Sequence, residues 1–185
     1  MLEDIVKSAQ DRMHKTIEAL KRDLATVRAG RATPAMLDKV MVEYYGAQMP
    51  VNQVSTVSVP EPRQLVITPW DKGVLSEIEK AIQKSDLGLN PMNDGSVIRL
   101  VIPPLTDERR QELTKVVRRM AEEARVAIRN VRRDANDELK RTEKAGDVSE
   151  DEVRRGMDRI QQLTDRFVVE VDKMLEVKER ELKEI

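Results

Sequence analysis

The longest stretch without Pro or Gly limits what this 185-residue chain can fold into. Residues 106–144 contain neither residue, and they predict one uninterrupted helix roughly 55 to 60 Å long. Apolar residues recur along it at alternating steps of three and four, namely Leu113, Val117, Met120, Ala124, Ala127 or Ile128, Val131 and Ala135. This spacing gives the helix one apolar seam, which needs partner helices to cover it.

A second stripe on the same predicted helix is basic. At about 100° per residue, four arginines fall within about 60° of one another, away from the seam: Arg118, Arg125, Arg129 and Arg132. One interpretation is a solvated face with ion pairs along the helix, which Glu122 supports. The other is a surface for a polyanion, because Arg133 and most of the stripe have few acidic neighbours one turn away and Arg suits phosphate recognition.

Two further stretches predict long helices with their own seams. Residues 2–29 and 149–183 both place apolar side chains at steps of three and four, and the second of these seams includes Met157. Gly30 is suited to follow the first helix, and Ser149 with Glu152 forms a capping box at the start of the last one. Residues 146–147 read as a tight turn, so the second and third helices should run antiparallel. We therefore predict a three-helix bundle.

The composition changes between the first and second helices. Four stretches have the composition of strands, namely residues 40–46, 51–59, 64–68 and 97–102. One amphipathic helix is predicted from Asp71 to about residue 88. The predicted fold class is α+β with two domains: residues 1–30 and 105–185 form the bundle, and residues 31–104 form a small α/β domain inserted between helix 1 and helix 2.

Two short connections should join these domains. Pro residues disfavour helix in both, so neither long helix is expected to continue into the inserted domain. The pair forms either a hinge or a rigid elbow, and the candidate residues are Gly30, Arg31, Ala32, Thr33, Pro34, Pro103, Pro104 and Leu105.

The chain lacks the residue patterns of an enzyme. It has no Cys and a single His, His14, and its glycines form neither a dinucleotide-binding nor a P-loop motif. We expect no catalytic site, no metal and no cofactor. The absence of Cys and of a secretory signal favours a cytoplasmic protein. With a net charge of −1, any polyanion binding must come from local charge segregation.

The few aromatic residues lie in the predicted inserted domain, apart from one Phe. Trp70, Tyr44 and Tyr45 could stack on bases, but we expect them to fill the small core instead. Methionines in the same domain are expected to fill the core or loops: Met36, Met41, Met49 and Met92.

Several segments, in this order, resemble those of bacterial ribosome recycling factors. RAGRATPAMLD at 28–38 is close to the family's RTGRASPALLD, with conservative departures. The other segments are VEYYG at 42–46, PVNQV at 50–54, SDLGLNPMNDGSVIRL at 85–100, IPPLTDERR at 102–110 and ARVAIRNVRRDAND at 124–137. The likeness runs from end to end of the chain.

The resemblance implies an L-shaped monomer, with a three-helix domain I and an α/β domain II joined at a hinge. It also implies binding to the post-termination ribosome, across the A and P sites of the large subunit. With elongation factor G and GTP, such a factor splits the ribosome into subunits and releases mRNA and tRNA; it is not itself an enzyme. From the residues alone, a coiled-coil adaptor or chaperone-like protein-binding module stays an alternative.

The resemblance also implies which residues contact rRNA. Arg110, Arg129 and Arg132 stand in the matching motifs, with Arg28 and Arg31 as further candidates near the hinge. The helix pattern adds three more candidate rRNA contacts: Arg118, Arg125 and Arg133. Arg110 lies nearer the apolar seam than the stripe, so only the resemblance and its place near the hinge favour it.

Overall fold

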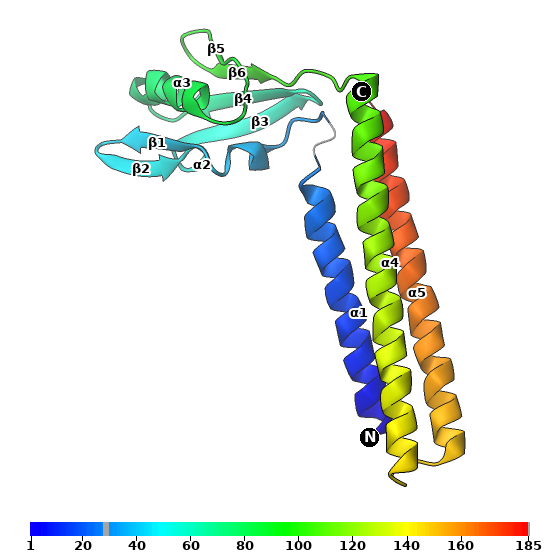
Figure 1. Cartoon of the computed structure of the whole chain (residues 1–185). Helices are drawn as coiled ribbons and strands as arrows, with labels where there is room; N and C mark the ends of the chain where they lie inside the picture. Colours follow the sequence, from blue (N-terminus) through cyan, green and yellow to red (C-terminus); the bar gives the residue numbers. More distant parts are fainter. Residues whose placement is uncertain (28–29, 185) are drawn as a thin grey trace. The chain divides into compact units, whose positions relative to one another are not determined.

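The computed structural model describes residues 1–27 and 30–184, which form two compact units (Figure 1). One unit contains residues 1–27 and 107–184, and the other contains residues 30–106. The first is helical and the second contains the sheets. The predicted α+β class, a long helical bundle with a small sheet domain inserted between its first and second helices, is confirmed.

The helical unit consists of α1 (Leu2–Ala25), α4 (Asp107–Lys144) and α5 (Glu150–Lys183). The three helices lie side by side, and α4 runs antiparallel to the other two (Figure 1). Their seams meet in a core with several completely buried side chains, including Met13, Val117, Ile128, Leu139 and Ile160. Each large apolar side chain buried in this way contributes about 1.5 to 3 kcal/mol.

The predicted seams are confirmed in most positions. On α4 the residues that pack inward are Leu113, Val117, Ala121, Ala124, Ile128, Val131, Ala135, Leu139 and Thr142. Met120, which the pattern placed in the seam, is only partly buried. The seam of α5 shifts in the same way, because Gly156 is buried where the pattern favoured Met157. A true helix turns 100° per residue, so a strict heptad drifts off the contact line.

The connection between α4 and α5 follows the sequence prediction. Gly146 has φ +80°, a left-handed conformation that favours Gly. Ser149 Oγ accepts the backbone N–H of Glu152 at 3.1 Å, and the Glu152 side chain reaches back to Ser149. These reciprocal bonds satisfy donors at the start of α5.

The first helix is shorter than predicted. The pattern extended it to residue 29, but α1 ends at Ala25. The backbone N–H groups of Thr26 and Val27 donate three residues back, to Asp23 and Leu24, and the Thr26 hydroxyl also donates to the Asp23 carbonyl. The last turn is thus tightened, and Gly30 does not follow the helix end directly.

The second unit contains two sheets. The hairpin pairs β1 (Met41–Tyr44) with β2 (Ala47–Pro50). The larger sheet has strand order β3–β4–β6–β5, all antiparallel, with bounds β3 (Ser55–Glu61), β4 (Gln64–Pro69), β5 (Met92–Asn93) and β6 (Ile98–Val101). The helical segments are η1 (Pro34–Leu37), α2 (Val51–Val54), η2 (Lys72–Val74) and α3 (Leu75–Lys84).

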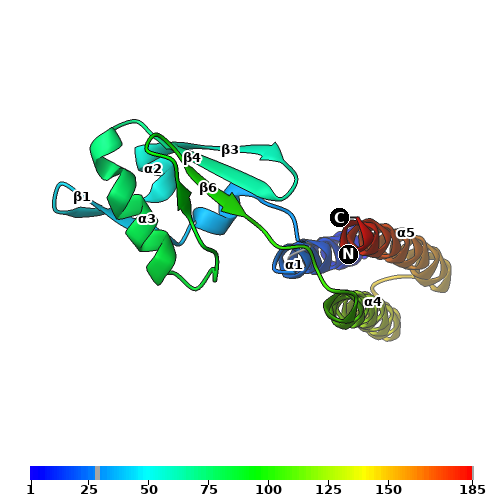
Figure 2. The same cartoon turned by 90° about the horizontal axis from the view of Figure 1, so that it is seen from above.

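The core of this unit lies where the sheet meets α3 (Figure 2). Leu65 pairs with Leu100 and Ile67 with Ile98, which puts these four side chains on one face of the sheet. Ile78 of α3 packs in the same cluster, and all five residues are completely buried.

Part of the strand prediction was wrong. Residues 51–54 form the helical turn α2, and the strand begins only at Ser55. The Ser55 hydroxyl donates to the Val51 carbonyl at 2.6 Å, a local bond that stabilises the turn. The short strands β2 and β5 were not predicted, because their sequences AQMP and MN contain no β-branched or aromatic residue.

Candidate nucleic-acid interface on helix α4

Helix α4 carries the predicted arginines, but they do not form one uniform surface. Arg118 Nε donates to Glu179 at 2.6 Å, and Arg125 Nη2 lies 2.7 Å from Asp172. The two arginines are seven residues apart, as are their partners on α5. Antiparallel helices keep such a register, so these pairs form a ladder along the α4–α5 contact. Arg132 continues it with a long bond of 3.5 Å to Gln161.

Arg125 is the most enclosed member of this ladder. Its side chain is 19% exposed, and it contacts Glu122 at 3.0 Å as well as Asp172. Burial alone would lower the pKa of Arg125, but the hydrogen bonds to Asp172 and Glu122 outweigh it, so the pKa lies above its ordinary value. The sequence showed few acidic neighbours along α4, whereas α5 supplies one from across the bundle. Arg125 therefore connects two helices.

Arg129 and Arg133 face outward instead. The Arg129 side chain is 45% exposed, and its nearest carboxylate, Glu122, lies 3.9 Å away. Arg133 is also exposed. The helical period places other exposed cations on this side of α4, which the sequence analysis did not single out. We use the name outer basic face for five exposed residues: Lys115, Arg119, Arg129, Arg133 and Lys140.

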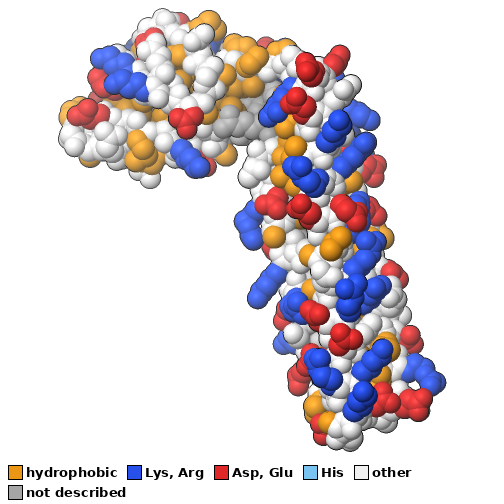
Figure 3. Space-filling view, in the orientation of Figure 1, with side chains coloured by type: hydrophobic (Ala, Val, Ile, Leu, Met, Phe, Trp, Pro, Cys, Tyr) orange, Lys and Arg blue, Asp and Glu red, His pale blue; other side chains and the backbone are white. Residues whose placement is uncertain are grey.

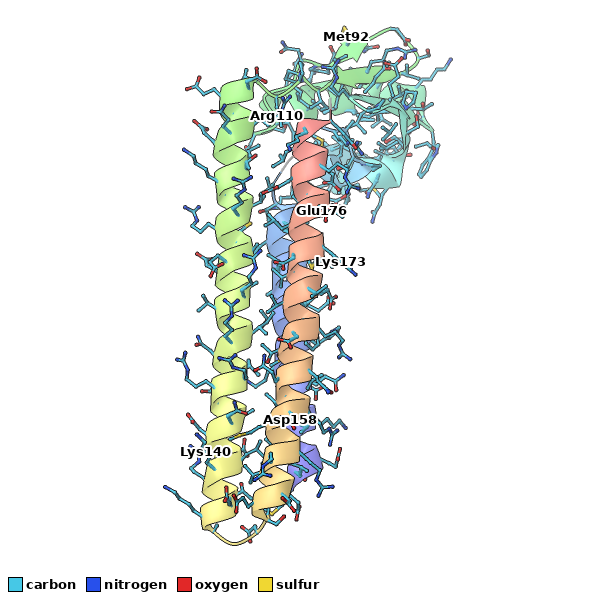
Figure 4. All side chains as sticks on the ribbon, turned by 90° about the vertical axis from the view of Figure 1, so that its right-hand side faces the viewer. Met92, Arg110, Lys140, Asp158, Lys173 and Glu176 are labelled. Atoms are coloured by element: carbon cyan, nitrogen blue, oxygen red, sulfur yellow. The ribbon has the colours of Figure 1, made fainter. Side chains whose placement is uncertain are left out.

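Figure 3 shows Lys and Arg side chains along α4, with acidic side chains among them. Lys140, labelled in Figure 4, marks the far end of the outer basic face. The signal for this face was present in the sequence as a second basic stripe, about 40° to 120° round the helix from Arg125. It was missed because Glu122 and Asp137 interrupt it.

Arg110 lies apart from both groups. Its side chain is 20% exposed, which agrees with a position nearer the seam, and Nη1 contacts Asp107 at 3.1 Å. Its Nε and Nη2 are buried and have no hydrogen-bond partner within the described residues. Buried donors without partners cost free energy, and these two nitrogens can reach an acceptor from outside only if the side chain moves.

The other two predicted contacts belong to the connection after α1. Arg31 is exposed, and Arg28 lies outside the described residues. Backbone hydrogen bonds hold both connections near the hinge candidates. Ala32 is buried and its N–H donates to the Pro62 carbonyl at 2.8 Å, and the N–H of Ile102 donates to Arg63 at 2.7 Å. These bonds fix both connections to the β3–β4 turn of the sheet unit.

Gly30 and Leu105 lie close together in the sheet unit. Gly30 has φ +71°, and a Cβ added to it would lie 3.3 Å from Leu105 Cγ. Thr33 is extended before η1, and Pro34 begins that turn. Ala32, Thr33 and Pro34 are therefore parts of the folded sheet unit. A hinge at these candidates stays a prediction.

The aromatic residues do not fill the core as expected. Trp70 is 68% exposed and Tyr45 is 84% exposed, while Tyr44 is only partly buried. The prediction for Trp70 and Tyr45 was wrong, because aliphatic side chains of the sheet and α3 already fill the space. Met41 and Met92 are exposed too.

Other candidate chemistry is limited in the described part of the chain. His14 is a surface residue 3.7 Å from Glu18. Residues 1–27 and 30–184 contain no group of three or more side chains that could hold a metal ion. Among the same residues, no helix has the length and apolar character needed to cross a membrane.

Comparison with known proteins extends the likeness over nearly the whole chain. A family model described as "Ribosome recycling factor" matches residues 20–182. A ribosome-recycling factor of Carboxydothermus hydrogenoformans is 66% identical over 182 residues, covering 98% of each chain. The protein of that name from Bacillus subtilis is 56% identical over 185 residues, covering all of both chains.

Two solved structures are also similar. A solution structure of a ribosome recycling factor matches with TM-score 0.75 and 44% identity, covering 100% of this chain and 98% of that one. The other is a Thermus thermophilus ribosome recycling factor, described with Escherichia coli elongation factor G bound to the post-termination complex. It matches with TM-score 0.62 and 49% identity over 98% of each chain.

Proposed function

Because the chain belongs to the ribosome recycling factor family, we propose that it binds the post-termination ribosome and splits it into subunits. Elongation factor G and GTP act with it, and the reaction releases mRNA and tRNA. The observation that carries this proposal is the full-length likeness to a factor described on the post-termination complex with elongation factor G. The protein acts in the cytoplasm as a monomer and is not an enzyme.

Helix α4 is proposed as the rRNA contact, within a domain I of residues 1–30 and 105–185. The outer basic face offers exposed guanidinium and ammonium groups, which suit phosphate oxygens. Arg129 is the contact that both the sequence motif and the exposed geometry favour, whereas Arg132 has the motif but lies at the α4–α5 side with a long bond to Gln161. Arg110 has two buried donor nitrogens without a partner among the described residues, and its side chain would have to move to present them to rRNA. Arg118 and Arg125 act first as links between α4 and α5.

The adaptor alternative has one supporting feature, an open groove of about 530 Å³ between α1 and α5. Its lining includes Ile17, Leu24, Met174 and Val177. Most side chains of the apolar seams are buried against the other helices of the bundle, so they are not available to bind another protein. Salt separates the two readings, since phosphate contacts weaken steeply with ionic strength and an apolar contact does not.

The decisive experiment is sedimentation of post-termination ribosomes with this protein, elongation factor G and GTP. Subunits should replace intact particles only when all three are present. Each omission serves as a control. Intact particles in the complete mixture would contradict the proposed function.

We also propose that the bundle binds rRNA while the sheet domain acts as a lever for elongation factor G, which predicts that binding and splitting can be separated. Replacing residues 32–103 by a short flexible linker should leave a folded bundle, since the helices bury their apolar side chains against one another within a separate compact unit. This bundle should bind ribosomes within about tenfold of the parent, roughly 1.4 kcal/mol, yet release few subunits. Pelleting measures binding and light scattering measures splitting. Full splitting without the sheet domain would contradict a lever role for it.

A further inference from the structure

Three of the chain's four aromatic residues gather in one part of the sheet unit. Tyr44 and Tyr45 lie at the β1–β2 turn, and Trp70 follows β4 directly. The Tyr45 hydroxyl donates to Asp71 at 3.1 Å, which joins the two segments. We call Tyr44, Tyr45, Trp70 and Asp71 the aromatic cluster. Its two outermost rings are exposed, so they contribute little to the core.

The polar ends of these rings are already bonded within the unit. Trp70 Nε1 donates to Thr56 Oγ1 at 2.9 Å, and the Tyr45 hydroxyl is held by Asp71. Tyr44 and Tyr45 meet edge to face, with ring centroids 4.4 Å apart. The rings are therefore oriented before any partner arrives, and a partner can contact their faces. Rings held in this way lose little conformational entropy on binding.

The backbone at Tyr45 is itself unusual. Tyr45 has φ +49° and Gly46 has φ +82°, which makes a two-residue type I′ turn between β1 and β2. Tyr45 is the only residue other than Gly with positive φ in the described part of the chain. Asn is preferred at such a position, because a bulky side chain is strained there. A strained residue with a solvent-exposed ring indicates a role outside the fold.

The charges around the cluster indicate what its partner carries. Ring faces and the Asp71 carboxylate are both electron-rich, and they suit a cation. The described residues 30–106 contain seven Lys and Arg against eight Asp and Glu, so this unit has no excess positive charge to hold a phosphate backbone. Tyr and Trp are also enriched in the centres of protein interfaces.

We propose that the aromatic cluster docks a partner protein through an Arg or Lys side chain placed over the Tyr45 ring beside Asp71, with the exposed Trp70 ring as a second contact on the segment that carries Asp71. The inference rests on the proposed function, because the partner is a protein component of the post-termination complex. The contact is cation–π in character, supplemented by the carboxylate. It is separate from the rRNA contacts of α4 and involves only residues of the sheet unit.

Full-length variants test this without disturbing the fold. Tyr45→Asn removes the ring while placing a favoured residue in the type I′ turn. Trp70→Ala removes the second ring, and Asp71→Asn removes the charge but keeps an oxygen for the Tyr45 hydroxyl. Met92→Ala is the matched control, because Met92 is an exposed apolar residue of β5 in the same unit (Figure 4). Melting curves confirm that each variant is folded.

The measurement is the affinity of each variant for post-termination ribosomes, with elongation factor G and a non-hydrolysable GTP analogue. Tyr45→Asn and Trp70→Ala should weaken binding about five- to thirtyfold, and Asp71→Asn should weaken it too. The salt dependence should stay close to that of the parent. Met92→Ala should bind like the parent.

The outcomes separate the possible partners. Ring variants that bind like the parent would overturn the inference and leave the proposed function intact. If the ring variants bind weakly but Asp71→Asn binds as well as the parent or better, the rings stack on bases, and the protein partner is refuted. A parent protein that does not bind at all would contradict the proposed function, and the inference with it.

Discussion

Arg125 and Arg129 are one turn apart on α4, yet the structure predicts opposite consequences for their replacement by Ala. Arg125 is 19% exposed and contacts two carboxylates, one of them on α5. Arg129 is 45% exposed and has one carboxylate at 3.9 Å. The first substitution should therefore affect the stability of the bundle, and the second should affect binding to rRNA.

The magnitude follows from the partners of each guanidinium. Hydrogen bonds to charged groups contribute about 1.5 to 3 kcal/mol, but Asp172 and Glu122 are both more than half exposed, which screens them. We expect Arg125→Ala to cost about 1 to 2 kcal/mol of unfolding free energy, and to lower the melting temperature by several degrees. Arg129→Ala should stay within about 0.5 kcal/mol of the parent.

Binding should show the reverse pattern. Arg129→Ala should weaken ribosome affinity and reduce the log–log salt slope by roughly one unit, on a duplex-phosphate approximation. Arg125→Ala should bind nearly like the parent at a temperature where it is folded. Thermal melts and pelleting across a salt series measure both properties.

A double-mutant cycle with Asp172→Asn isolates the cross-helix pair, because that change removes the charge from α5 alone. The reasoning would be refuted if Arg125→Ala melted like the parent and instead lost affinity and salt slope. The ion pair would then open on the ribosome, and Arg125 would belong with the rRNA contacts.

Three further predictions concern the bundle. Glu3 has a pKa below its ordinary 4.5, because Arg159 donates a hydrogen bond to its carboxylate. The pair should therefore stabilise the fold above about pH 4.5 and lose this effect as the pH falls. Glu3→Gln and the parent should differ in melting temperature at pH 7 and have similar melting temperatures in acid. Gly156→Ala should lower the melting temperature by an amount corresponding to about 1 to 3 kcal/mol despite a better helix propensity. The new Cβ would lie 2.6 Å from a methyl group of Leu2 and 3.1 Å from one of the fully buried Leu139. Val171→Ala should cost on the order of 1 to 3 kcal/mol by leaving a cavity in the core, and a melt identical to the parent's would place Val171 outside it.

The long helices were predictable because their signals are local and redundant. Each apolar seam repeats over many turns, and the capping box of Ser149 and Glu152 needs only four consecutive residues. The end of α1 was not predictable from the seam. Val27 continues the apolar pattern and is buried, but the backbone has already left the helix at Ala25. Side-chain burial and helical backbone are separate properties, and periodicity reports only the first.

The sheet unit was harder to predict because its choices depend on distant residues. Val51 and Val54 fit a strand by propensity, yet both point into the core from a helical turn. Trp70 resembles a core residue by type, but the interior is filled by aliphatic side chains from β4, β6 and α3. Which residues are left outside depends on the packing of the whole unit, and no short window of sequence contains that information.

The arginines of α4 show where sequence reasoning about a binding face reaches its limit. A helical wheel groups Arg118, Arg125 and Arg129 within about 60°, and at that resolution they are equivalent. The structure separates them, because α5 lies along one edge of the stripe and supplies carboxylates at 2.6 to 2.7 Å to the two residues nearest to it. A guanidinium with such partners already has its charge compensated, so it offers less to a phosphate than its neighbour one turn away. The position of the adjacent helix, more than the residue type, therefore decides which cation stabilises the bundle and which is available to bind RNA.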